Sequence, residues 1–118
     1  MKGLIETALF RTGASQHMTE RATEELIDTL ARDPFAGDLI PGTGGIRKLR
    51  WGTGKVGKRG GVRIFYYARP QTDRPTYLLI CMPKREDKRL TAAQKKALTR
   101  AVAEIDRVAV ARRDKEER

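Results

Sequence analysis

The feature that most constrains this chain is a glycine-rich segment between two stretches that alternate like strands. The segment reads GTGKVGKRGG and covers residues 52–61. Before it, IRKLRW (46–51) alternates apolar and basic residues, and after it VRIFYYAR (62–69) is rich in β-branched and aromatic residues. Such alternation is typical of half-buried strands. We therefore predict that residues 52–61 form the tip of a long basic hairpin.

The same segment partly matches the phosphate-binding loop of nucleoside triphosphatases. Gly52, Gly57 and Lys58 fit its G-x-x-x-x-G-K pattern, but Arg59 stands where that loop needs a hydroxyl to ligate Mg²⁺. A phosphate loop also runs from a strand into the N-terminus of a helix, whose dipole helps to hold the phosphates. Here a second strand is predicted instead. The sequence therefore argues against a nucleotide cofactor.

Two segments before the hairpin predict further elements. Residues 4–10 (LIETALF) are expected to form a first strand, with a helical start as the alternative. Thr19 is placed to cap a helix whose apolar residues recur at helical spacing, and Asp33-Pro34 ends it.

Two segments after the hairpin complete the pattern. TYLLICM (76–82) is nearly all apolar, which predicts an interior strand. A helix is expected over residues 90–113, with Thr91 and Gln94 at capping-box spacing and a polar, frayed tail at about 112–118.

The order of these elements is strand, helix, three strands, helix. It predicts a single α+β domain over residues 1–118, with a small, mainly antiparallel sheet and helices packed on it. The three consecutive strands would form an antiparallel meander, and the N-terminal strand would join the same sheet.

Charge is concentrated in the middle of the chain. The formal net charge is +10, yet no Asp or Glu occurs from Leu39 to Thr72. The same stretch holds eight cations, which are Arg47, Lys48, Arg50, Lys55, Lys58, Arg59, Arg63 and Arg69. Eight of the eleven glycines lie between Gly42 and Gly61, a composition suited to bringing backbone amides and cations close to phosphate. This block predicts a polyanionic partner, above all a nucleic acid.

Other residue types narrow the possible chemistry. There is one cysteine, Cys81, and no apolar run approaches the length of a membrane span, so a cytoplasmic protein without a membrane partner is expected. The one histidine, His17, is expected in a surface loop without metal-binding partners, and no metal site is predicted. Cations alone can promote RNA cleavage, because the 2′-hydroxyl is the nucleophile and the phosphorane charge needs stabilisation.

Three motifs carry a resemblance to a known family. GDLIPGTGGIRKLR, GKVGKRGGVRIFYY and YLLICMPKRE, followed by a basic helix, resemble the RelE/ParE superfamily of bacterial toxins, above all its HigB-like, RelE-type branch. The resemblance covers about residues 1–110. It implies a RelE-like fold and a toxin of a type II toxin–antitoxin system that inhibits translation and arrests growth. It further implies metal-independent cleavage of messenger RNA in the ribosomal A site, and a cognate antitoxin, commonly a helix-turn-helix protein like HigA.

The resemblance also implies roles for individual residues. Lys48 matches a basic residue that contacts phosphate or acts as a base, Arg63 a phosphate-stabilising arginine, and Lys84 and Arg85 a third basic position. Binding of RNA or the ribosome is assigned to Arg47, Arg50, Lys55, Lys58 and Arg59. One departure is that the segment after Lys84-Arg85-Glu86 lacks the tyrosine common in the family, so the general acid is not identified. Two alternatives stay open: a ParE-like gyrase poison and a non-catalytic RNA- or ribosome-binding module.

Overall fold

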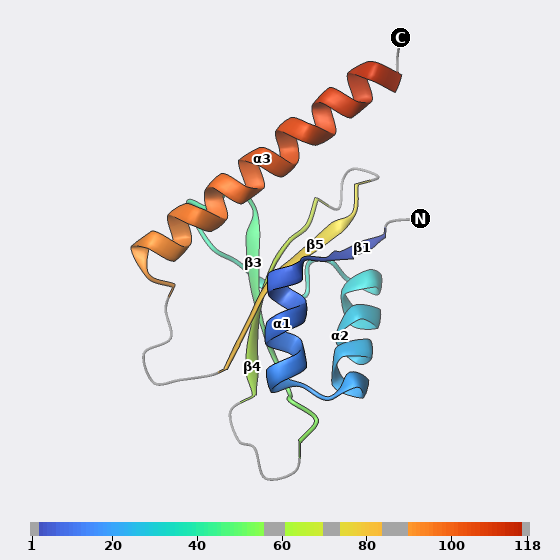
Figure 1. Ribbon diagram of the computed structural model, residues 1–118, viewed down its shortest axis with the longest axis vertical. Helices are drawn as coiled ribbons and strands as arrows, with labels where there is room; N and C mark the ends of the chain where they lie inside the picture. Colours follow the sequence, from blue (N-terminus) through green and yellow to red (C-terminus); the bar gives the residue numbers. More distant parts are fainter. Residues whose placement is uncertain (1–2, 56–60, 70–73, 84–89, 117–118) are drawn as a thin grey trace.

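The computed structural model describes residues 3–55, 61–69, 74–83 and 90–116, with side chains described as far as residue 108. Within these ranges the chain forms five strands and three helices (Figure 1). In chain order they are β1 (Leu4–Glu6), α1 (Ala8–His17), α2 (Glu20–Arg32), β2 (Asp38–Leu39), β3 (Ile46–Trp51), β4 (Val62–Tyr67), β5 (Thr76–Pro83) and α3 (Ala92–Glu116).

The five strands form one sheet in the order β1-β5-β4-β3-β2. The pairs β2–β3, β3–β4 and β4–β5 are antiparallel, and β1 pairs with β5 in parallel. This confirms the predicted α+β class, the antiparallel meander and the interior position of the apolar strand β5. It also confirms that the glycine-rich segment connects two strands, as expected for a hairpin and not for a phosphate loop.

The N-terminal prediction was wrong in its extent. The first strand stops at Glu6, because Thr7 caps a helix: its Oγ1 accepts a hydrogen bond from the Phe10 amide at 3.1 Å. Residues 8–10, expected to be extended, therefore begin α1. The same helix corrects the position of His17, which is the last residue of α1 and does not lie in a loop. The short strand β2 was also not foreseen.

The capping predictions are confirmed. Thr19 Oγ1 accepts from the Ala22 amide at 3.1 Å at the start of α2. At the start of α3, Thr91 and Gln94 each accept from the other's amide at 3.0 Å, a complete capping box. α3 continues to Glu116, so most of the tail that was expected to fray is helical. None of the helices in the described ranges has the length and apolar character to cross a bilayer.

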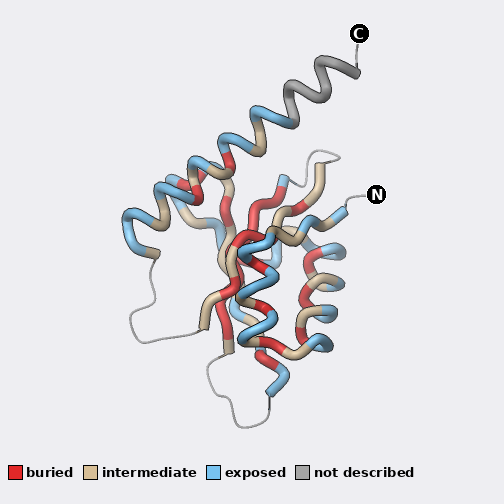
Figure 2. Tube along the Cα trace, viewed as in Figure 1, coloured by how far each residue is buried: buried red, intermediate tan, exposed pale blue. Residues whose placement is uncertain are grey.

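The sheet has a different apolar core on each face (Figure 2). Even-numbered residues of β4, such as Ile64 and Tyr66, pack against α1 and α2. Odd-numbered residues of β4, such as Phe65 and Tyr67, pack with Leu98 and other residues of α3. All six residues of β4 are buried, which is expected for the middle strand of a sheet covered on both sides.

α1 lies very close to β5 because Gly13 has no side chain. A Cβ built on Gly13 would clash with the Cys81 carbonyl oxygen, far inside van der Waals contact. The neighbouring Phe10 and Ala14 are buried against the same strand layer. Burial raises the pKa of the Cys81 thiol to about 11. Gly13 thus sets how closely the first helix can approach the sheet.

α3 is attached to the other face through Asp106. Its carboxylate accepts from the Tyr67 hydroxyl at 2.7 Å and from Arg69 Nη2 at 3.0 Å. Burial of the Tyr67 ring and, next, this hydrogen bond raise the pKa of the phenol to about 12. The apolar contacts of α3 are made by Leu98, Val102 and, in part, Ile105.

Gly13→Ala should destabilise the protein although alanine is the better helix former. Alanine would gain up to about 1 kcal/mol in helix propensity, whereas overpacking a core contact costs about 1 to 3 kcal/mol. Urea unfolding followed by circular dichroism measures the balance, with the exposed Ser15→Ala in the same helix as the control. A Gly13→Ala protein as stable as Ser15→Ala would show that the close approach to β5 is not a constraint.

The Tyr67 phenol should make folding stability depend on pH above pH 10. Its pKa is about 12 in the folded protein, whereas an unperturbed tyrosine has a pKa of 10.0, so the unfolded chain ionises first. The stabilisation is therefore complete below pH 10 and is lost as the pH rises to about 12. Comparing the unfolding free energies of wild type and Tyr67→Phe between pH 8 and 12 tests this. A difference that does not shrink over this range would contradict the assignment.

Candidate nucleic-acid interface

The register of β3 and β4 brings three of the predicted cations to one face of the sheet. Arg50 lies directly opposite Arg63, and Lys48 lies opposite Phe65. Residues that oppose one another on antiparallel strands point to the same face, and so do residues two apart on one strand. Lys48, Arg50 and Arg63 therefore share a face, and we call these three residues the basic face.

The basic face occupies the part of one sheet surface that the apolar core beneath α3 does not cover. On that surface Leu98 and Val102 of α3 belong to one apolar cluster with Ile46, Phe65 and Tyr67. Arg63 has Met82 of β5 on its other side. One surface of the sheet thus changes from an apolar core to a row of cations within the length of a single strand.

The three cations differ in their exposure. Arg63 is buried, with 8% of its surface exposed, whereas Lys48 is half-buried and Arg50 is exposed. Like charges placed directly opposite each other in an antiparallel pair are destabilising, and this register places Arg50 against Arg63. A phosphate against this face would be attracted by both guanidinium groups, one of them in surroundings that screen charge less than water does.

A pocket of about 310 Å³ adjoins the basic face at the edge of β3. It is lined by Ala36, Gly37, Asp38, Lys48, Leu49 and Arg50. β2 pairs only with Arg47 and Lys48, so within the described residues the β3 edge from Leu49 to Trp51 has no neighbouring strand. Lys48 and Arg50 are therefore reachable from the edge of the sheet as well as from its face.

Arg47 is directed away from the basic face. It has the opposite parity on β3, its Nη1 donates to the Gly37 carbonyl at 2.8 Å, and its guanidinium lies 4.7 Å from the Phe35 ring centre. These contacts fix the segment between α2 and β2 against the sheet. The structure thus separates Arg47 from the other strand cations with which the sequence grouped it.

Lys55 also lies apart from the basic face. Its Nζ donates to the Gln16 carbonyl at 3.1 Å, near the C-terminal end of α1, where a cation is favoured by the helix dipole. Its backbone amide donates to Thr53 Oγ1 at 3.0 Å. Four other predicted site residues, Lys58, Arg59, Lys84 and Arg85, lie outside the described residues.

Two tyrosines that could have supplied a general acid are used elsewhere. Tyr66 is buried on the α2 side, where its hydroxyl accepts from the Gly37 amide at 2.8 Å and donates to the Pro34 carbonyl at 2.9 Å. Burial is the main cause that raises the pKa of this phenol. Tyr67 is held by Asp106. Neither hydroxyl is placed to donate a proton at the basic face.

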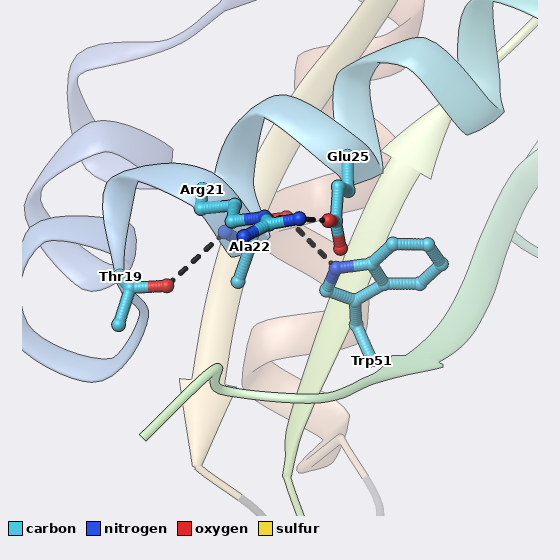
Figure 3. Close-up of polar contacts among 5 residues, drawn as sticks. All are labelled: Thr19, Arg21, Ala22, Glu25 and Trp51. Atoms are coloured by element: carbon cyan, nitrogen blue, oxygen red, sulfur yellow. Dashed lines mark hydrogen bonds and ion pairs between the residues drawn. The ribbon is translucent and has the colours of Figure 1, made fainter. Parts of the chain in front are cut away.

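A second pocket, which the sequence did not reveal, lies between the start of α2 and the end of β3 (Figure 3). Its volume is about 450 Å³, and Trp51, Arg21 and Glu25 are among its lining residues. One feature of the sequence could have indicated this pocket, namely a basic strand that ends in a tryptophan. Its pairing with a helix about 30 residues earlier could not be read from local pattern.

No protein-family model matches this sequence.

Arg47 and Arg50 offer a matched pair of variants. Arg50→Ala should weaken binding to single-stranded RNA about tenfold at low salt with little change in stability, because Arg50 is exposed on the basic face. Arg47→Ala should lower the free energy of unfolding by about 1 to 2 kcal/mol through its lost hydrogen bond and ring contact. Its RNA affinity should stay near that of wild type. The reverse pattern in filter binding and urea unfolding would show that the two strand faces have been assigned wrongly.

Proposed function

We propose that this protein is a ribosome-dependent endoribonuclease that cleaves messenger RNA and inhibits translation, as the toxin of a bacterial toxin–antitoxin pair. The observation that carries the proposal is the register that sets Arg50 opposite Arg63, with Lys48 on the same face. A row of three cations beside an open strand edge suits a phosphodiester backbone. The RelE-type motifs described above support the same activity.

The proposed reaction needs no group beyond those of the RNA and the side chains. The 2′-oxygen attacks the adjacent phosphorus, the bond to the 5′-oxygen breaks, and the products carry a 2′,3′-cyclic phosphate and a 5′-hydroxyl. Arg63 is suited to stabilise the charge of the phosphorane, because it is held in the middle strand and is largely removed from water. Lys48 would orient the 2′-hydroxyl as a cation or, in its uncharged form, take the proton of that hydroxyl.

Lys84 and Arg85 complete the proposed catalytic set on sequence grounds. The described part of β5 ends at Pro83, which pairs with Val62, the residue before Arg63. Lys84 and Arg85 follow directly in the sequence and lie outside the described residues. A protonated lysine is a suitable donor to the leaving 5′-oxygen.

A second candidate is an RNA- or ribosome-binding protein that does not cleave. The specific observation in its favour is the engagement of Tyr66 and Tyr67 in structural hydrogen bonds, which leaves neither available as a proton donor. The third candidate is a gyrase poison, which is tested by looking for damage in the DNA of the same cells. In either toxin reading the proposed partner is a cognate antitoxin in the bacterial cytoplasm.

Mapping of messenger RNA 5′ ends after induced expression tests the proposal. Wild type should arrest growth and produce cuts in phase with codons. Arg63→Met keeps an unbranched stem of similar length in the strand but removes the charge, so cleavage should fall by about 100-fold. The matched control is Arg32→Ala, an exposed cation at the end of α2, which should cleave like wild type.

Three results would contradict the proposal. A folded Arg63→Met protein that still cleaves would remove Arg63 from the site. Intact transcripts with damaged DNA would identify a gyrase poison. Intact transcripts with purified protein that retards RNA in a gel would identify a binding protein without nuclease activity.

A further inference from the structure

The pocket between α2 and β3 has the composition of a site for a flat ligand. Eight residues line its roughly 450 Å³, namely Thr19, Arg21, Ala22, Glu25, Arg50, Trp51, Gly52 and Gly54. This volume lies within the range of small-ligand sites. The chain's single tryptophan thus borders a pocket whose other walls are a helix start, two glycines and two arginines.

The indole of Trp51 is held in a fixed orientation. Its Nε1 donates to the Ala22 carbonyl at 2.9 Å, and the Ala22 amide donates to the capping Thr19 Oγ1 at 3.1 Å (Figure 3). The side chain packs in part against the α1–α2 core but stays only half-buried. A ring that is anchored through its nitrogen and is partly open to a pocket is preorganised for stacking.

Glycines keep the wall beside the ring free of side chains. Gly54 has φ +78°, and a Cβ there would clash with Thr19 Oγ1, so the backbone approaches the start of α2 closely. At Gly52 a Cβ would meet nothing within 4 Å. The space beside Trp51 is therefore bounded by backbone on one side and remains open on another.

The charges of the pocket favour an anionic ligand. Arg21 and Glu25 form an ion pair of 3.2 Å on the exposed face of α2, so their charges offset each other. Arg50 supplies the remaining positive charge. Arg50 lines both this pocket and the one beside Lys48, at the stretch of β3 that has no neighbouring strand among the described residues.

We propose that this pocket binds one nucleobase of a single-stranded RNA, stacked on Trp51, while Arg50 holds the phosphate that leads to the basic face. The inference rests on the RNA binding of the proposed function and extends it from phosphate contacts to a base contact. Stacking on an aromatic side chain accepts any base, because every base has a π face. The pocket would fix the position of the strand relative to Arg63 and would not read its sequence.

The fluorescence of Trp51 provides a direct test, since the chain has no other tryptophan. The probes are an octameric oligoadenylate and an octamer of the same length and charge with abasic nucleotides. Oligoadenylate should quench the emission, whereas the abasic strand should bind through its phosphates with little quenching.

Two variants separate stacking from structure. Trp51→Leu keeps an apolar side chain against the core but loses the aromatic ring, and should bind oligoadenylate about tenfold more weakly. It should bind the abasic strand as wild type does. Trp51→Phe retains a ring and should keep most of the affinity, measured by fluorescence anisotropy of labelled RNA. Unfolding curves of both variants check that the fold is retained.

The outcomes distinguish this inference from the proposed function. In one outcome, oligoadenylate binds tightly without quenching, with the same affinity for Trp51→Leu as for wild type. This result overturns the base site but leaves the RNA-binding function intact. Stacking without any cleavage of messenger RNA supports the base site and refutes the nuclease. Wild-type protein that binds neither strand overturns the base site, whereas the ribosome-dependent nuclease is judged by the mapped messenger RNA ends. Quenching by an acidic peptide that contains phenylalanine, and not by RNA, would assign the pocket to a protein partner instead.

Discussion

The pairing of β4 with its two neighbours is the constraint on which the rest of the structure depends. All six of its residues are buried, and its two faces pack into separate cores. A slip of one residue relative to β3 would exchange the faces, placing Arg63 among the apolar residues under α1 and α2 and Ile64 among the cations. The register that builds the two cores is therefore the same register that assembles the basic face.

The sheet face that carries α3 has its stabilising contacts at one end and its cations at the other. At one end Leu98, Val102 and the Asp106 hydrogen bonds fix the helix to the sheet. At the other end Arg50 and Arg63 oppose each other, and like charges in this position are destabilising as a pair. β4 has a paired neighbour on each side, so its ladder hydrogen bonds and its two cores hold Arg63 in this register.

Local sequence signals were reliable where a single residue type has a specific physical role. The caps at Thr19 and Thr91, the meander and the interior position of β5 all followed from capping chemistry and apolar patterning. α1 was missed because its apolar residues are few and Gly13 lowers its helix propensity. That glycine is explained by its closeness to Cys81, which no local pattern contains. For the same reason, Arg47 could be separated from Arg50 only once the strand faces were known, and the pocket at Trp51 depends on a contact with α2.

The parallel pairing of β1 with β5 has a consequence for synthesis of the chain. Thr7 Oγ1 donates to the Leu78 carbonyl across 71 positions of sequence, and α1 packs on the same strand. β1 thus has no strand partner until β5 has also been synthesised, and before then α1 lacks the strand on which it packs. The sheet is therefore completed late, as expected for folds rich in distant contacts. A chain proposed to act on ribosomes would thus be unable to complete its own sheet until a ribosome had added residues 76–83.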